Sequence, residues 1–80
     1  MSYFVYILQC ADGTLYTGWT NNLDKRLEKH NTGKGSKYVR ARLPATLAYF
    51  EKLANIKEAM ARERAIKALP RASKLKIINQ

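Results

Sequence analysis

Apolar and aromatic side chains fill consecutive positions near the start of the chain, and later segments show helical spacing. Residues 3–9 are apolar at both parities, which predicts a central strand covered on both faces. Residues 14–20 have the composition of a returning strand, and residues 47–52, with Tyr49 and Phe50, are predicted to add a third. The pattern therefore predicts a three-stranded antiparallel sheet.

The segment between the second and third strands is predicted to form a helix and then a loop. Asn21-Asn22 is typical of a helix start, and Asp24 in the first turn favours the helix dipole, so we expect a helix over residues 23–31. Residues 32–36 contain two glycines and are predicted to be a flexible loop. The sequence leaves the structure of the basic segment 37–42 open.

The chain after the third strand is predicted to form two further helices. Asn55 followed by Glu58 resembles a capping box, and Pro70 must end the helix that they begin. A last amphipathic stretch is expected to pack through Leu75 and Ile78. We therefore predict an α+β fold, a three-stranded antiparallel sheet flanked by helices in the order β-β-α-β-α-α, with residues 1–80 as a single domain.

The loop of the hairpin determines which side chains share a face of the sheet. A two-residue turn at Asp12-Gly13 places Tyr6 and Tyr16 on opposite faces. A three-residue loop with Gly13 in the left-handed conformation brings both tyrosines to one face. The sequence is compatible with either loop, and any joint role of the two phenols depends on the second.

One helix of the C-terminal half carries a charged residue on its apolar side. A helical wheel over residues 56–69 groups four apolar residues on one arc: Ile56, Ala59, Met60 and Ile66. Glu63 falls near the middle of this arc, where an ionised carboxylate is costly unless it is paired, hydrogen-bonded or metal-bound. Lys67 lies one turn later on the same side, so an intrahelical ion pair and a functional carboxylate both remain open.

The helix over residues 23–31 has a similar anomaly. Leu23 and Leu27 define its apolar stripe, and Arg26 and His30, four residues apart, flank the stripe on one side. Taken alone, Arg26 suits a partly buried stem with a solvated head, and His30 suits the surface of a helix end. Together with Glu63 and the two tyrosines, they instead indicate that two helices direct polar groups toward the hairpin.

The distribution of charge points to a polyanionic partner. Fifteen Lys and Arg against six Asp and Glu give a net charge of +9. Residues 1–24 contain no Lys or Arg, whereas residues 25–42 and 57–76 each contain seven. Such clustering suits nucleic acid, because each neutralised phosphate releases condensed counterions. A highly soluble basic domain with no nucleic-acid role is the alternative.

Other features restrict the class of protein. No stretch approaches the roughly 20 apolar residues of a membrane span, and residues 1–9 lack the basic flank of a signal peptide. Cys10 is the single cysteine, so it cannot form an internal disulfide, and with His30 it is too little for a metal site. We therefore expect a cytoplasmic monomer without membrane contact.

The polar candidates together suit phosphodiester hydrolysis, which needs an activated water, charge stabilisation at phosphorus and help for the departing oxygen. Tyr16 is a candidate base, provided that nearby cations make its phenol more acidic. Arg26 could balance the negative charge of the transition state. Glu63 could hold one Mg²⁺ or similar hard cation, with waters and substrate completing its shell. Tyr6 and His30 could orient the water or the scissile phosphate.

Two tyrosine tripeptides and three later residues match a known pattern. They are Phe4-Val5-Tyr6, Tyr16-Thr17-Gly18, Arg26, His30 and Glu63. The chain resembles the GIY-YIG nuclease superfamily over nearly its whole length, and specifically the small stand-alone bacterial members. The resemblance implies metal-dependent cleavage of DNA, with Tyr16 as base, Arg26 as electrostatic stabiliser and Glu63 as ligand of one divalent cation, Mg²⁺ or Mn²⁺.

Two positions depart from the pattern of the superfamily. Phe4 stands where the first motif usually has glycine, which changes packing more than chemistry. Trp19 stands where some members have a lysine, so one cation near Tyr16 is absent from this sequence. Lys37 and Lys67 are candidate substitutes between which the sequence does not decide.

Superfamily nucleases usually carry an additional DNA-binding domain, which we do not find in residues 1–80. We therefore expect the affinity for DNA to come from basic side chains or from a protein partner that supplies specificity. The candidates for nucleic-acid binding are Lys25, Lys34, Lys37, Arg40, Arg42, Arg62, Arg64 and Lys67, with Arg71 and Lys74 as further cations.

We predict a metal-dependent endonuclease that hydrolyses DNA phosphodiester bonds, in DNA repair or in the processing of branched or flexible DNA. The alternative is a catalytically weak or inactive nucleic-acid-binding module, for DNA or RNA, that retains the fold. A scaffold protein whose basic face binds an acidic protein is a third interpretation. A cleft shared by the two tyrosines, Arg26 and Glu63 would favour the nuclease, whereas Glu63 buried against Lys67 away from the tyrosines would exclude the metal site.

Overall fold

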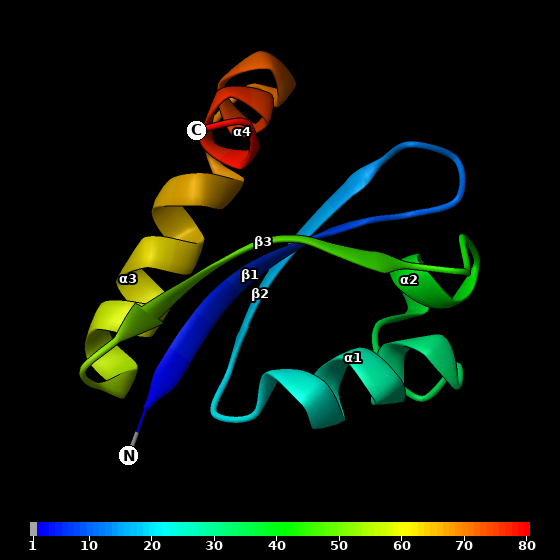
Figure 1. Cartoon of the computed structure of the whole chain (residues 1–80), viewed down its shortest axis with the longest axis horizontal. Helices are drawn as coiled ribbons and strands as arrows, with labels where there is room; N and C mark the ends of the chain where they lie inside the picture. Colours follow the sequence, from blue (N-terminus) through cyan, green and yellow to red (C-terminus); the bar gives the residue numbers. More distant parts are fainter. Residues whose placement is uncertain (1) are drawn as a thin grey trace.

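The chain folds as a three-stranded antiparallel sheet with helices on both faces, and the computed structural model describes residues 2–80 (Figure 1). The strands are β1 (Tyr3–Gln9), β2 (Leu15–Thr20) and β3 (Thr46–Leu53). β1 lies between β2 and β3, so the strand that is apolar at both parities is the central one, as predicted. The other two strands form the edges of the sheet.

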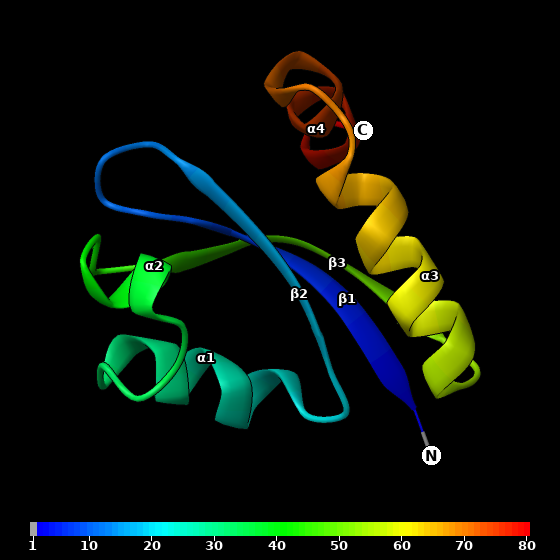
Figure 2. The ribbon, with the colours of Figure 1, turned by 180° about the vertical axis from the view of Figure 1, so that it is seen from behind.

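Two helices cover each face of the sheet (Figure 2). They are α1 (Leu23–Asn31) and α2 (Lys37–Arg40) on one face, and α3 (Ile56–Lys67) and α4 (Arg71–Ile78) on the other. The α+β class and the predicted order are confirmed, with α2 as an additional short helix in the segment that the sequence left open. Its N-cap is Ser36, whose Oγ accepts a hydrogen bond from the Tyr38 amide at 3.1 Å.

The helix starts follow the capping residues of the sequence. The side chain of Asn22 accepts a hydrogen bond from the amide of Lys25 at 3.1 Å. The side chain of Asn55 accepts one from the amide of Glu58 at 2.9 Å, and the Glu58 carboxylate accepts one from the Ala54 amide at 3.2 Å. The predicted capping box is therefore confirmed in a variant whose second bond is made one residue before the cap.

The hairpin adopts the three-residue loop. The amide of Cys10 donates to the carbonyl oxygen of Thr14 at 2.9 Å, and the amide of Gly13 donates back to Cys10 at 2.9 Å. Gly13 has φ +84°, in the left-handed region that glycine adopts without a steric penalty. Of the two loops that the sequence allowed, the structure contains the one that joins the paired residues Cys10 and Thr14 through three residues.

This loop fixes the register of the hairpin. Tyr6 lies opposite Gly18, and Leu8 lies opposite Tyr16. Directly opposed residues share a face, and so do residues two apart on one strand. Tyr6 and Tyr16 are therefore on the same face of the sheet, the face that α1 and α2 cover.

β1 supplies buried side chains to both faces of the sheet. Tyr6 and Leu8, 2% and 1% exposed, pack toward α1 and α2. Val5 and Ile7 are fully buried on the other face, together with Ala59 and Ile66 of α3. Burial on both faces accounts for the absence of charged residues from the strand.

The apolar stripe of α3 is narrower than predicted. Ile56 and Met60 are 43% and 41% exposed, whereas Ala59 and Ile66 are 0% exposed. At 100° per residue, Ile56 and Glu63 lie on one flank of the line through Ala59 and Ile66. This flank borders the edge strand β2 instead of the core.

The last helix packs on the same face as α3. Ile77 and Ile78 contact the core cluster there, so the prediction for Ile78 is confirmed. Leu75 is half-buried but lies outside the cluster, and Ile77 makes the packing contact that was predicted for Leu75. Among residues 2–80, no helix is both long and apolar enough to cross a bilayer.

Candidate active site

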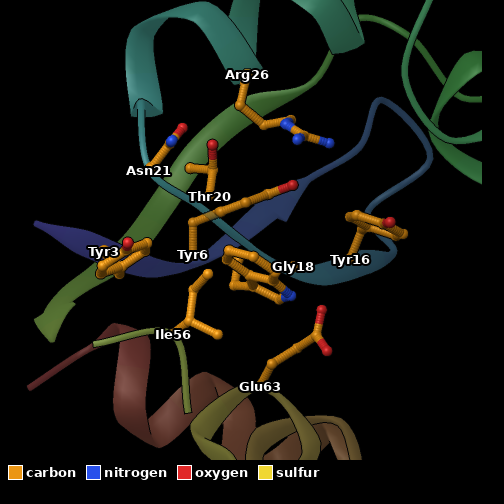
Figure 3. Close-up of a pocket in the computed structure, with 10 residues that line it drawn as sticks. Tyr3, Tyr6, Tyr16, Gly18, Thr20, Asn21, Arg26, Ile56 and Glu63 are labelled. Atoms are coloured by element: carbon orange, nitrogen blue, oxygen red, sulfur yellow. The ribbon is translucent and has the colours of Figure 1, made fainter. Parts of the chain in front are cut away.

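A cavity of about 520 Å³ opens beside the edge strand β2, between α1 and α3 (Figure 3). Its lining residues come from both faces of the sheet because the cavity passes around this open edge. They are Tyr3, Tyr6, Tyr16, Gly18, Trp19, Thr20, Asn21, Arg26, Ile56 and Glu63. Four of the five predicted catalytic residues therefore line one cavity, and the fifth, His30, contacts Tyr6 directly behind it.

Tyr6 forms a buried hydrogen bond with His30 of α1. The Tyr6 hydroxyl lies 3.0 Å from Nε2 of His30, whose side chain is 1% exposed. Burial raises the pKa of Tyr6, and the neighbouring Tyr16 adds to this effect. Burial and the nearby Arg26 lower the pKa of His30. Both groups are therefore neutral at pH 7. Because His30 is buried, the interpretation that places it on the surface of a helix end is wrong.

Glycines make room for this pair. A Cβ atom at Gly18 would lie 2.5 Å from the Tyr6 hydroxyl oxygen, so the Tyr6 ring crosses β2 only because residue 18 has no side chain. A Cβ atom at Gly35 would likewise collide with the His30 ring. The loop after α1 thus closes over His30 and leaves its Nδ1 atom buried without a hydrogen-bond partner among the described residues.

Tyr16 reaches the cavity from β2 and is half-buried. Its ring lies 5.4 Å from the His30 ring in an edge arrangement, with the planes at 65°. The Tyr38 ring of α2 is also stacked on it, at 6.1 Å with the planes at 25°. None of the hydrogen bonds found among residues 2–80 involves the Tyr16 hydroxyl, so the phenol is free to meet a substrate.

Arg26 enters the cavity from the first turns of α1. The Asn22 cap fixes the start of this helix, and the Arg26 amide donates to the Asn22 carbonyl oxygen at 3.1 Å. Arg26 forms none of the ion pairs found among residues 2–80, and its guanidinium points toward the tyrosines (Figure 3). A guanidinium held this way presents several donors to an anion.

Glu63 reaches the same cavity from α3, on the opposite side from Arg26 (Figure 3). Its side chain is 22% exposed, and its carboxylate lies 3.7 Å from Nζ of Lys67 one turn later. Both interpretations left open for Glu63 therefore describe part of its environment. The pair with Lys67 exists, yet the carboxylate lies with the tyrosines and not apart from them.

The predicted nucleic-acid-binding residues fall into two groups. Three of them pair with acidic side chains: Arg42 with Asp12 at 3.1 Å, Arg62 with Glu51 at 2.9 Å, and Lys67 with Glu63 at 3.7 Å. The others form no ion pair among residues 2–80, and they are Lys25, Lys34, Lys37, Arg40 and Arg64. Four of these five cations lie on α1, α2 and the loop between them, and Arg64 lies on α3.

Several cavity residues were not identified from the sequence. Gly18 and Thr20 follow Tyr16 at a spacing of two, so strand parity could have placed them on its face. Tyr3 and Trp19 have the opposite parity, and their rings pack against each other at 6.4 Å. They line the cavity only because it passes around the edge strand β2. No local sequence pattern indicates this arrangement.

Comparison with known proteins identifies the family. Residues 2–76 match the GIY-YIG catalytic domain. The chain belongs to the GIY-YIG family. Such a domain suggests nuclease activity and implies, in general terms, binding of nucleic acid, and it does not specify a substrate.

The GIY-YIG domain has close homologues among the uncharacterised UPF0213 proteins of bacteria. One from Clostridium perfringens is 55% identical over 76 residues, which cover 95% of this chain and 82% of that protein. One from Oceanobacillus iheyensis is 55% identical over 76 residues, covering 95% of this chain and 88% of that protein. These relatives share the domain over nearly its whole length.

Two solution structures share the GIY-YIG fold. A UPF0213 protein from Bacillus halodurans superposes with a TM-score of 0.64 at 42% identity, covering 99% of this chain and 84% of that one. A protein from E. faecalis gives a TM-score of 0.67 at 36% identity with the same coverage, 99% and 84%. The arrangement of a three-stranded sheet between two pairs of helices is therefore common to these proteins.

The buried His30 is expected to make the stability of the GIY-YIG domain pH-dependent. The pKa of His30 in the folded protein lies below the ordinary 6.5, so the unfolded chain binds a proton that the folded chain excludes. The free energy of unfolding should therefore decrease as the pH falls below 6.5, by up to about 1.4 kcal/mol per pH unit. Urea unfolding between about pH 5 and pH 7.5 measures this decrease.

The variant His30→Gln provides the control. The pKa values of Asp12 and Glu51 are lowered from 3.8 and 4.5. These carboxylates therefore change the free energy of unfolding mainly at pH values below about 4.5. The variant should be less stable near neutral pH, with a flatter pH dependence. An equal slope in both proteins would show that His30 is not the group responsible.

Proposed function

We propose that this GIY-YIG protein is a metal-dependent endonuclease that hydrolyses DNA phosphodiester bonds in the cavity beside β2. The observation that carries the proposal is that two phenols, a guanidinium and a carboxylate line this one cavity: Tyr6, Tyr16, Arg26 and Glu63. They come from four separate elements and both faces of the sheet. A purely structural account would leave this convergence of unlike polar groups unexplained.

The roles of the two tyrosines differ because their environments differ. The Tyr6 phenol is buried against neutral His30 and stays protonated, since its pKa is raised by burial. It therefore acts through hydrogen bonds, orienting the water or the scissile phosphate. The Tyr16 hydroxyl forms no hydrogen bond among residues 2–80, so as a phenolate it is the group that takes the proton of the attacking water.

Arg26 supplies positive charge at the reacting phosphate. A phosphodiester gains negative charge on its non-bridging oxygens as water attacks, and a fixed cation stabilises that charge more than the charge of the ground state. The Arg26 guanidinium lines the cavity without an acidic partner among the described residues. It is thus available to the phosphate without first breaking an ion pair.

Glu63 fits a single-carboxylate site for a hard divalent cation. Its carboxylate lines the cavity and accepts no hydrogen bond among residues 2–80, and its one ion-pair partner there is Lys67. Those residues contain no cluster of three or more His, Cys, Asp or Glu, so water and substrate oxygens would complete the shell. When bound, Mg²⁺ or Mn²⁺ would neutralise charge on the phosphate.

DNA is expected to approach over the outer face of α1. Lys25, Lys29 and Lys34 border one shallow hollow there, with Glu28 as the acidic residue among them. A second hollow shares Lys25 and Lys29 with the first and shares Arg26 with the active-site cavity. The three hollows adjoin, which gives the sugar-phosphate backbone a basic path to the scissile position.

Cleavage assays test the proposal directly. Wild-type protein is incubated with linear duplex, single-stranded and branched DNA, with Mg²⁺, with Mn²⁺ and with a chelator. We expect metal-dependent cleavage of at least one substrate, and its loss in Tyr16→Phe, which removes the hydroxyl and keeps the ring. Cleavage that survives this substitution would come from a contaminant or from another site.

The same samples distinguish the alternative function. A nucleic-acid-binding module without turnover would bind DNA or RNA with a steep dependence on salt, yet cut neither. Absence of binding to any nucleic acid at low salt would contradict both functions and favour a scaffold for an acidic protein. The cavity favours the nuclease, because binding alone needs neither a neutral Tyr6–His30 pair nor an inward-facing carboxylate.

A further inference from the structure

The rings of His30 and Tyr38 both pack against the Tyr16 ring, and Tyr38 does not line the cavity. The Tyr16 ring packs against two others, that of His30 at 5.4 Å and that of Tyr38 at 6.1 Å. No hydrogen bond among residues 2–80 restrains the Tyr16 hydroxyl. The direction of this phenol is therefore set by ring packing, and Tyr38 is the outer of its two supports.

Tyr38 is itself fixed by Arg42, although 39% of it is exposed. The guanidinium carbon of Arg42 lies 3.9 Å from the centre of the Tyr38 ring, on which it stacks as a cation. Nη1 of Arg42 also donates to the carbonyl oxygen of Tyr38 at 2.8 Å. One side chain thus holds both the ring and the backbone of Tyr38.

Arg42 in turn is anchored to the hairpin loop. Its Nε lies 3.1 Å from the carboxylate of Asp12, and its carbonyl oxygen accepts a hydrogen bond from the Ala11 amide at 2.9 Å. The Asp12 carboxylate also accepts from the hydroxyl and the amide of Thr14, at 2.6 Å and 3.1 Å. The loop that sets the register of β2 therefore also holds the residues that support Tyr16.

We propose that Tyr38 is a positioning residue for Tyr16, fixed in place by the contacts that Arg42 makes with Asp12. This inference rests on the proposed function, in which Tyr16 accepts the proton of the attacking water. A reacting group that is displaced by about 1 Å loses roughly 10²-fold in rate. Arg42, predicted to bind nucleic acid, instead serves the geometry of the site.

Two substitutions at residue 38 separate positioning from direct contact with DNA. Tyr38→Ala removes the support, and we expect the single-turnover rate at saturating protein to fall by about 10-fold to 10²-fold. The dissociation constant for DNA should change by no more than about threefold, since no phosphate contact is lost. Tyr38→Phe keeps the stacked ring and should restore the wild-type rate.

Phe50→Ala is the matched control. Phe50 is another exposed aromatic side chain, 51% accessible, on β3 and outside the cavity. Its removal should leave the cleavage rate unchanged. A loss of DNA affinity in Tyr38→Ala with an unchanged rate at saturation would overturn the inference and show that Tyr38 contacts the substrate.

A measurement on the free protein tests the geometry independently of activity. Nuclear Overhauser contacts between the rings of Tyr16 and His30 should be present in the wild type and in Tyr38→Phe, and should be lost or weakened in Tyr38→Ala. Unchanged contacts in Tyr38→Ala would refute the positioning role. If the wild type cuts no DNA, the proposed function fails, while these contacts still decide whether Tyr38 holds the Tyr16 ring.

Discussion

Replacing Glu63 by glutamine is expected to lower the single-turnover rate of DNA cleavage by about 10³-fold, near the upper limit for loss of one transition-state interaction. Glutamine has the same shape, but it is neutral and binds a hard divalent cation poorly. The partner of Glu63 is Lys67, whose side chain is 52% exposed, so loss of that pair costs little stability. The free energy of unfolding should therefore change by no more than about 0.5 kcal/mol.

Glu58→Gln is the matched control for this loss of charge. Glu58 belongs to the same helix and lies outside the cavity, and its hydrogen bond to the Ala54 amide can be made by glutamine as well. The Glu58→Gln variant should cleave DNA at the wild-type rate at every Mn²⁺ concentration. A Glu63→Gln variant that still cuts DNA with the same Mn²⁺ dependence would remove Glu63 from the metal site.

The central strand and the helix starts could be predicted because each depends on local sequence. β1 is apolar at both parities, and only a strand covered on both faces suits that pattern. Asn22 and Asn55 cap helices through bonds to residues three positions ahead. These features need no knowledge of the remaining chain.

The hairpin register could not be predicted because the dipeptide Asp12-Gly13 suits both loops. In the structure, Asp12 bonds to Thr14 and to Arg42, which lies thirty residues further along. A contact with a distant segment of the chain therefore helps to stabilise the three-residue loop. Sequence spacing within the hairpin does not contain this information.

The burial of His30 and the position of Glu63 also depend on distant contacts. His30 is covered by the loop that includes Gly35, and its ring bonds to Tyr6 of β1. Glu63 lies on a helix that covers the face opposite to the two tyrosines. The helical wheel puts Glu63 near the middle of an apolar arc, whereas the buried stripe is narrower and leaves Glu63 on its flank. The wheel also cannot show that the carboxylate reaches the cavity around the open edge of β2.

Gly18→Ala is expected to disrupt the site from inside the sheet. The new Cβ would lie 2.5 Å from the Tyr6 hydroxyl oxygen and 2.7 Å from the ring carbon that bears it. Either the Tyr6 ring or the backbone of β2 must therefore move. Tyr6 is 2% exposed and bonded to His30, which leaves its ring no free space. We expect a loss of about 1–3 kcal/mol in the free energy of unfolding, as for other overpacked interiors.

Cleavage should fall in the Gly18→Ala variant by about 10²-fold, because a displaced Tyr6 ring shifts the wall of the cavity and breaks the hydrogen bond to His30.

The variant Gly33→Ala separates this effect from a loss of stability alone. Gly33 has φ +79° at the end of α1, where a Cβ would meet only ordinary contacts with Arg40, so alanine there costs about 1 kcal/mol through backbone strain. Urea unfolding and single-turnover cleavage, measured where both variants are folded by circular dichroism, should show reduced stability in both and lost cleavage in Gly18→Ala alone. If Gly33→Ala loses as much cleavage at equal folded fraction, the contact between Gly18 and Tyr6 is not what shapes the site, because activity then follows stability and not the cavity wall.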